Sequence, residues 1–287
     1  MTKSIAGYEN SIFRKIIIFI VHFFMNLLFL KKNSEYSNEF SRILNSYSKK
    51  KITFDGNEIF FKTGHNRLDS RVERFFIDEP LLIEWIKKFN SDDIFLDIGA
   101  NVGTYSMAAL SKGSFVYSIE MDLNNSAVLF ENIFLNKFYN KSVILPFGVG
   151  SKDNLETIFY RDFTPGDCLQ SIGREAQIPT IKRNPFQIKQ PIFSLDKVFE
   201  NLSLKQPTKI KIDVDGNEKF VFEGGKKVIL NANEIYYEDI GSNEDKEVID
   251  TILKSNFYIS SEMSATNQLA GRVDRNILFK KNESSKI

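Results

Sequence analysis

Acidic residues and glycines form a spaced set in the first half of the chain. One apolar run ends around Asp97 and is followed by Gly99 and Gly103. The next apolar run is followed directly by Glu120. Gly99 permits a tight turn, and Gly103 lets the backbone approach a ligand closely. A carboxylate such as that of Glu120 can accept hydrogen bonds from both hydroxyls of a ribose. The set therefore indicates a nucleotide-like ligand bound beside a glycine turn.

The same loop distinguishes between two nucleotide cofactors. Nicotinamide enzymes carry Gly-x-Gly-x-x-Gly, which suits a pyrophosphate, whereas this loop has Asn101 in place of the middle glycine. Asp97 would repel a phosphate, but it suits the cationic amino-acid end of S-adenosylmethionine. The loop therefore favours S-adenosylmethionine as the cofactor. The alternatives are a nicotinamide-dependent oxidoreductase and a purely structural turn beside a solvated Glu120.

A second acidic group follows two later apolar runs. Asp213, Asp215 and Glu218 follow one run, and Glu238 ends the next. A hydroxyl is a poor nucleophile unless its proton is accepted, so Asp213 is predicted as the catalytic base or orienting group and Glu238 as the second candidate. Asp215 could instead cap the following helix, and the acids together could hold Mg²⁺, although no metal is expected. His65 is a further candidate base.

The elements that must position these residues alternate between strand and helix. Such alternation predicts an α/β fold, with a doubly wound, mostly parallel sheet and helices on both faces. Ligands of such sheets bind beyond the carboxyl ends of the strands, where both acidic groups fall. Residues 162–191 carry several prolines and are predicted to be irregular, as a functional loop or a disordered one. The expected strands cover residues 94–98, 115–119, 142–147, 209–214, 234–238, 257–260 and 275–279.

Three segments carry a resemblance to a known family. Phe95-Leu-Asp-Ile-Gly-Ala-Asn-Val-Gly-Thr-Tyr-Ser106 resembles motif I of the FkbM family of methyltransferases, and residues 119–125 are similar to the segment that follows it. Lys211-Ile-Asp-Val-Asp-Gly-Asn-Glu218 resembles the second signature of that family. The resemblance extends over residues 79–280. The chain departs from the family at Met121, which replaces a frequent proline, and at Asp215, which replaces glutamate; both changes are conservative.

The resemblance implies a Rossmann-like class I methyltransferase fold that binds S-adenosylmethionine and methylates hydroxyl groups of sugars or polyketide-like compounds. By position, it places four residues at the methionine end of the cofactor: Asp97, Gly99, Asn101 and Gly103. It places Glu120 at the ribose and residues 147–150 near the adenine. Together with the acidic groups, it predicts O-methylation of a sugar, glycolipid or related metabolite.

The charge balance and the cysteine content limit the classes of binding partner and the cellular setting that the sequence predicts. Lys and Arg total 38 and Asp and Glu total 37, which gives a net charge of +1. A balanced charge offers no global field for a polyanion, so no nucleic-acid partner is expected, and the acceptor should be a small molecule or a glycan. Cys168 is the single cysteine, which excludes an intrachain disulfide and fits a cytoplasmic setting. A membrane-associated, non-catalytic module is the remaining alternative.

The N-terminal segment is apolar between basic residues. Ile16–Leu30 would span roughly 22 Å as a helix, which is short of the ~30 Å hydrocarbon core of a bilayer. It lacks the small residues of a signal-peptide cleavage site. Three interpretations stay open: contact with the inner membrane surface through residues 12–32, packing against protein, and a true span. The predicted domains are residues 1–48, helix and linker, and residues 49–287, the methyltransferase domain, with its core at 79–280.

Overall fold

The computed structural model describes residues 20, 49–64, 66–160, 162–168, 170–173, 186–267 and 272–282. Contacts divide the chain into residues 1–49 and residues 50–287, and the second unit holds the elements that follow. The predicted N-terminal helix, its membrane contact and His65 lie outside the described residues. Within the described ranges, no helix is long and apolar enough to cross a membrane.

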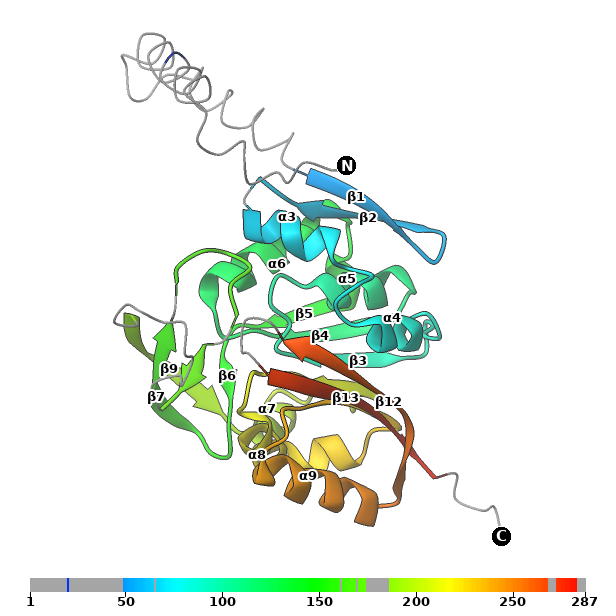
Figure 1. The fold of residues 1–287 in the computed structure, drawn as a ribbon, viewed down its shortest axis with the longest axis vertical. Helices are drawn as coiled ribbons and strands as arrows, with labels where there is room; N and C mark the ends of the chain where they lie inside the picture. The colour runs from blue at the N-terminus through cyan, green and yellow to red at the C-terminus, as the bar shows by residue number, and fades with distance from the viewer. Residues whose placement is uncertain are drawn as a thin grey trace. The chain divides into compact units, whose positions relative to one another are not determined.

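A mixed sheet forms the centre of the fold (Figure 1). In the described part of the chain it has seven strands in the order β12-β13-β11-β10-β3-β4-β5. The five strands from β11 to β5 run parallel, whereas β13 is antiparallel to both β11 and β12. The predicted α/β fold with a mostly parallel sheet is confirmed. The strands are β3 (Ile94–Ile98), β4 (Phe115–Ile119), β5 (Ser142–Leu145), β10 (Lys209–Ile212), β11 (Glu234–Asp239), β12 (Phe257–Asn267) and β13 (Arg272–Lys281).

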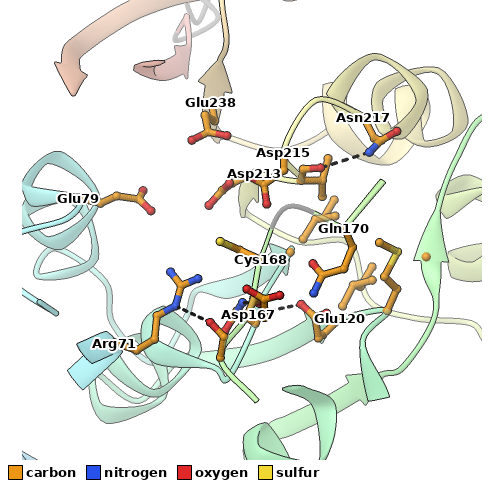
Figure 2. Close-up of a pocket in the computed structure, with 18 of the residues that line it drawn as sticks. Arg71, Glu79, Glu120, Asp167, Cys168, Gln170, Asp213, Asp215, Asn217 and Glu238 are labelled. Atoms are coloured by element: carbon orange, nitrogen blue, oxygen red, sulfur yellow. Dashed lines mark hydrogen bonds between the residues drawn. The ribbon is translucent and has the colours of Figure 1, made fainter. Parts of the chain in front are cut away.

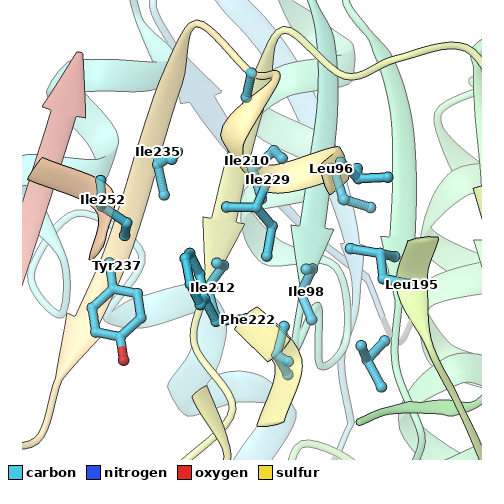
Figure 3. Packing of buried hydrophobic residues seen from close by; sticks show 14 of the residues in the cluster. Leu96, Ile98, Leu195, Ile210, Ile212, Phe222, Ile229, Ile235, Tyr237 and Ile252 are labelled. Atoms are coloured by element: carbon cyan, nitrogen blue, oxygen red, sulfur yellow. The ribbon is translucent and has the colours of Figure 1, made fainter. Parts of the chain in front are cut away.

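Helices cover both faces of this sheet because its strands are apolar on both sides. Successive side chains of a strand point to opposite faces. Phe95 therefore packs with residues of α4 (Pro80–Ile86), α5 (Thr104–Ser111) and α6 (Leu123–Leu135). Leu96 and Ile98 pack in the opposite layer with residues of α7 (Leu195–Asn201), α8 (Glu218–Leu230) and α9 (Asn243–Lys254), as Figure 3 shows. The two layers fix the strand ends at which the acidic residues lie.

A hairpin and a short helix precede the sheet. Strands β1 (Lys49–Phe54) and β2 (Asn57–Lys62) pair with each other, and α3 (Asn66–Glu73) follows. The backbone amides of Phe60 and Lys62 in β2 donate to side-chain oxygens of α6 and its cap, at 2.8 Å and 2.7 Å. These bonds join the β1–β2 hairpin to the helix that follows β4.

A smaller sheet is inserted between β5 and α7. It contains β6 (Gly148–Val149), β9 (Phe186–Phe193), β7 (Asn154–Tyr160) and β8 (Ser171–Ile172), in that spatial order. The predicted irregular segment, residues 162–191, therefore contributes β8 and most of β9, and this part of the prediction is wrong. Pro191 is tolerated in β9 because β6 pairs only with Ile192 and Phe193, which leaves an open strand edge at the proline. A 3₁₀ helix, η2 (Tyr139–Lys141), precedes β5.

Candidate functional site

A cavity of about 670 Å³ lies at the carboxyl ends of β3, β4, β10 and β11. Its volume falls in the range of cofactor and substrate sites. Five of the seven predicted cofactor-binding and catalytic residues line it: Gly99, Asn101, Glu120, Asp213 and Glu238. Figure 2 shows the acidic side chains around this space. Asp97 and Gly103 are not part of the lining, so the structure brings together most of the predicted set.

The loop after β3 is shaped by close packing against its neighbours. Gly99 has φ 80°, and a Cβ atom there would lie 1.9 Å from the carbonyl oxygen of Asp213. Asn101 has φ 51°, a conformation that asparagine tolerates better than most residues. Gly103 precedes α5, and a Cβ atom there would lie 2.3 Å from Leu129 Cδ1. Gly103 is thus required for packing against α6.

Asp97 lies beneath this loop and is fully buried. Its Oδ2 accepts a hydrogen bond from Ser106 Oγ at 2.6 Å, and Lys211 Nζ lies 3.6 Å from its Oδ1. Lys211 is also buried, and its Nζ lies 2.8 Å from Asp213 Oδ2. Burial raises the pKa of Asp97, although the Lys211 charge and the Ser106 hydrogen bond counteract it. Lys211 therefore links the first acidic group to the second.

Glu120 is held in place by backbone amides. Its Oε2 accepts from Asn101 N at 2.8 Å, and its Oε1 accepts from Asp122 N at 2.7 Å. Burial raises the pKa of Glu120 to about 7. Asp122 in turn caps α6 by accepting from Asn124 N at 2.8 Å. Each carboxylate oxygen can accept more than one hydrogen bond, so Glu120 keeps acceptor capacity toward the cavity.

Two partly buried glutamates stand at the end of β11 and at the start of α4. Glu238 Oε2 is buried and has no hydrogen-bond partner among the described residues, while burial and the nearby charges of Asp213 and Asp215 raise the pKa of Glu238. Glu79 Oε2 accepts from Tyr236 Oη at 3.0 Å, and burial raises the pKa of Glu79 to about 7. Glu79 precedes Pro80 at the start of α4, yet its side chain makes no cap bond there. It lines the cavity instead.

The turn after β10 has a different organisation from the predicted helix cap. Asn217 is the N-cap residue of α8, and it makes no side-chain cap bond. Glu218 Oε1 accepts from Val214 N at 3.0 Å and from Gly216 N at 3.1 Å. Burial raises the pKa of Glu218 to about 8. Glu218 therefore fixes the turn that carries Asp213 and Asp215, and it does not line the cavity.

The segment of residues 166–168 forms one wall of the cavity. Asn101 Nδ2 donates to the carbonyl of Asp167 at 2.7 Å, and Asn125 Nδ2 donates to the same carbonyl at 3.1 Å. From the other side, Arg71 Nε donates to the carbonyl of Gly166 at 3.2 Å. Gln170, just beyond this segment, also lines the cavity. The wall is thus tied both to the loop after β3 and to α3.

Sequence reasoning missed several residues of this site, among them Arg71, Glu79 and Lys211. Lys211 begins the second family signature, which was the available signal. Glu79 lies at the first position of the resemblance, next to a proline that suggested only the start of a helix. Arg71 lies before the resemblance begins, and nothing in its surrounding sequence marks it. Within the described ranges, no group of three or more His, Cys, Asp and Glu side chains is arranged to hold a metal ion.

A family model described as the methyltransferase FkbM domain matches residues 97–260, which is more than half of the chain. The chain belongs to the FkbM methyltransferase family. A curated relative, the hexuronic acid methyltransferase AglP of Haloferax volcanii, is 22% identical over 184 residues, which cover 64% of this chain and 70% of the relative. The family resemblance predicted from the motifs is therefore confirmed.

Two solved structures are similar in fold. The FkbM methyltransferase of Methylobacillus flagellatus KT has a TM-score of 0.45 and 15% identity, covering 66% of this chain and 44% of that one. A tRNA methyltransferase of M. jannaschii has a TM-score of 0.44 and 16% identity, covering 83% and 58%. This chain thus matches about half the length of each of these proteins. The expectation that nucleic acid is not a partner stays a prediction.

Proposed function

We propose that this member of the FkbM family transfers a methyl group from S-adenosylmethionine to a hydroxyl oxygen of a sugar, glycolipid or related metabolite. The observation that carries the proposal is the cavity itself. One part of it presents the rigidly held carboxylate of Glu120, and another presents Asp213 and Glu238. A cofactor site and a proton-accepting site thus share one space. The relative AglP, named as a hexuronic acid methyltransferase, supports a sugar acceptor.

The residues present suit S-adenosylmethionine. The remaining acceptor capacity of Glu120 fits a ribose diol, because its orientation is already set by two backbone amides. Beyond Glu120, Met121, Phe147 and Gly148 line the cavity and offer apolar surface to an adenine. Gly99 and Asn101 also line the cavity, and the amino-acid end of the cofactor would lie beside them. Asp97 is hydrogen-bonded to Ser106 of α5, the helix that follows this loop, so its role is to position the loop between β3 and α5.

The bound cofactor supplies a methyl carbon, whose bond to sulfur breaks with the electron pair left on sulfur as the acceptor oxygen bonds to the carbon. Asp213 accepts the proton that the hydroxyl loses. Its carboxylate is held by Lys211 Nζ at 2.8 Å and lines the cavity. Orienting the acceptor oxygen in line with the methyl carbon can contribute roughly 7–11 kcal/mol to the lowering of the barrier.

Glu238 complements Asp213 in this scheme. Burial, with the charges of Asp213 and Asp215, raises the pKa of Glu238 and favours its protonated form. Its Oε2 has no partner among the described residues. A protonated carboxyl can donate a hydrogen bond, so Glu238 is suited to orient an oxygen of the acceptor. In this scheme Asp213 accepts the proton and Glu238 orients the substrate.

Two measurements test the proposal. Isothermal titration of the purified chain with S-adenosylhomocysteine should give saturable binding, and absence of heat at high protein concentration would contradict the cofactor assignment. Radiolabelled methyl transfer to fractionated cell extract should then label a glycan or glycolipid fraction. Binding of NADH in place of S-adenosylhomocysteine would favour the oxidoreductase. If the chain binds the cofactor, labels no acceptor, and retains its biological phenotype in Asp213→Asn, the non-catalytic module would be favoured.

A further inference from the structure

Helix α3 places one arginine, Arg71, at the cavity without an acidic partner among the described residues. Arg67 and the neighbouring Arg74 each form an ion pair with nearby aspartates. Arg71 donates only its Nε, to the carbonyl oxygen of Gly166 at 3.2 Å. In the described part of the chain, no carboxylate lies within 4.0 Å of its guanidinium. Figure 2 shows this guanidinium pointing into the cavity, so its remaining N–H groups face the ligand space.

Hydrogen bonds place Arg71 at one particular part of the cavity wall. Arg71 Nε donates a hydrogen bond to the carbonyl oxygen of Gly166. Asn101 Nδ2 donates to the carbonyl oxygen of the next residue, Asp167, at 2.7 Å. Asn101 is the middle residue of the loop between the two cofactor glycines. Arg71 therefore lies at the part of the cavity wall that contacts that loop. The amino-acid part of the cofactor would lie beside this loop.

Glu79 supplies the opposite charge on the same side. Its Oε2 accepts from Tyr236 Oη, and it forms no ion pair with a described residue. Figure 2 shows Glu79 and Arg71 extending from neighbouring elements toward the same space. Among the described residues, Arg71 and Glu79 do not pair with each other, so a guanidinium and a carboxyl group face the cavity separately. A ligand group that carries both charges would satisfy both residues.

We infer that Arg71 and Glu79 bind the zwitterionic amino-acid end of S-adenosylmethionine, Arg71 at its carboxylate and Glu79 at its ammonium. The inference rests on the proposed cofactor. A guanidinium matches a carboxylate with two parallel N–H donors, which lysine cannot reproduce. Glu79 is already oriented by the tyrosine hydroxyl, so binding an ammonium requires little rearrangement. Arg71 and Glu79 thereby bind the part of the cofactor that the nucleoside-binding residues leave without partners.

The test compares two ligands that differ only at the amino-acid end. S-adenosylhomocysteine carries the zwitterion, whereas 5′-methylthioadenosine shares the nucleoside and the thioether but lacks it. Isothermal titration of full-length protein measures both ligands on the wild type, on Arg71→Gln and on Glu79→Gln. Each substitution should weaken S-adenosylhomocysteine about tenfold or more, because it removes a charged hydrogen bond. Affinity for 5′-methylthioadenosine should change less than about threefold, within the range of an uninvolved site.

Controls separate charge, geometry and folding. Arg275→Gln removes an arginine that lies outside the cavity lining and should leave both affinities unchanged. Arg71→Lys keeps the charge without the two-donor geometry, so its affinity for S-adenosylhomocysteine should fall between those of wild type and Arg71→Gln. If Arg71→Gln fails to fold, Arg71→Lys is compared with the wild type instead. Unchanged 5′-methylthioadenosine affinity in that variant would show that its cavity is intact.

The outcomes are distinct. If the wild type binds neither ligand, the proposed function fails. If the wild type binds both but the Arg71 and Glu79 variants bind S-adenosylhomocysteine as tightly as wild type, the inference is overturned and the proposed function stands. An equal loss for both ligands also overturns it, since the residues would then act on the cavity as a whole. A variant that alters only the acceptor KM would assign Arg71 to an anionic acceptor and overturn the inference as well.

Discussion

At the scale of single residues, three glutamates of the same chemistry differ because of what surrounds them. Glu120 receives two backbone amides, Glu218 receives two amides on one oxygen, and Glu238 has an oxygen without a partner among the described residues. Glu218 only stabilises a turn, Glu120 stabilises a loop and also lines the cavity, and Glu238 has an oxygen that a ligand could contact. Because all three side chains carry the same carboxyl group, the difference in their roles comes from their hydrogen-bond partners.

Glu120→Gln should weaken the binding of the whole nucleoside. An amide replaces one carboxylate oxygen with an NH₂ group, which cannot accept from Asn101 N or Asp122 N. We expect the dissociation constants of S-adenosylhomocysteine and 5′-methylthioadenosine to rise together by about tenfold or more. Isothermal titration checks this. A loss confined to S-adenosylhomocysteine would show that Glu120 does not contact the ribose.

Asp213→Asn should reduce catalysis and leave the cofactor bound. The amide cannot accept the hydroxyl proton, so kcat should fall by about 10²–10⁴, the usual contribution of a general base. Cofactor affinity should change less than about threefold, because the substitution alters charge at the acceptor side. Single-turnover methyl transfer and titration measure the two effects.

Glu238→Gln retains a hydrogen-bond donor and should mainly raise the KM for the acceptor. A larger loss of kcat in Glu238→Gln than in Asp213→Asn would exchange the roles proposed for these two residues.

At the scale of elements, the loop after β3 depends on close contact with the end of β10. The missing side chain of Gly99 lets the loop pack on the carbonyl of Asp213. Because β3 and β10 are neighbouring parallel strands, this contact brings the cofactor loop beside the proposed base. The loop also receives the carboxylate of Glu120 from the end of β4. One short segment thus joins three strand ends.

Gly99→Ala tests this contact. Its Cβ would lie 1.9 Å from Asp213 O, so the two strand ends must separate, whereas Gly56 has a similar φ of 82° and a Cβ there would meet no atom within 4 Å. Gly56→Ala should cost about 1–2 kcal/mol of unfolding free energy from backbone strain alone. Gly99→Ala should cost about 1–3 kcal/mol more from overpacking and should weaken cofactor binding. Urea denaturation compares the two, and equal losses would contradict the close contact.

At the scale of the whole molecule, buried carboxyl groups concentrate at the ligand-binding edge. Burial raises the pKa of Glu79 and Glu120 to about 7 and of Glu218 to about 8, above the ordinary value of 4.5. The folded protein therefore binds more protons than the unfolded chain between about pH 4.5 and 8. Their stabilising contribution is complete below pH 4.5 and is lost as the pH rises through these values. At neutral pH the acidic binding site thus lowers the stability of the fold.

Unfolding free energy should consequently fall between pH 5 and pH 8. Glu218→Gln isolates one contribution, because the amide oxygen can still accept from Val214 N and Gly216 N but does not titrate. We expect the variant to match the wild type within about 1 kcal/mol at pH 5 and to exceed it by at least about 1 kcal/mol at pH 8, since each unit of pKa difference corresponds to about 1.4 kcal/mol. Denaturation at both pH values measures the difference; parallel curves would contradict it.

Local sequence was sufficient for the alternation of strands and helices and for the glycine loop with its acids. Apolar runs and turn glycines are short-range signals, because strand and helix periods and tight turns involve neighbouring residues. They predicted the mostly parallel sheet and placed Gly99, Glu120, Asp213 and Glu238 at the carboxyl ends of its strands, where they line the cavity. The predicted irregular segment was wrong in part, because β9 is stabilised by pairing with β7, which no local pattern shows.

Tertiary structure alone decided which acids face the cavity. Lys211 lies opposite Asp97 in the pairing of β10 with β3, so the buried lysine draws that carboxylate beneath the loop. Gly103 makes room for Leu129, and Arg71 reaches the cavity from a helix that precedes every motif. These contacts join residues far apart along the chain, where spacing carries no information. The sequence by itself determined the fold class and the chemistry available, and packing determined which groups hold the loops and which face the cavity.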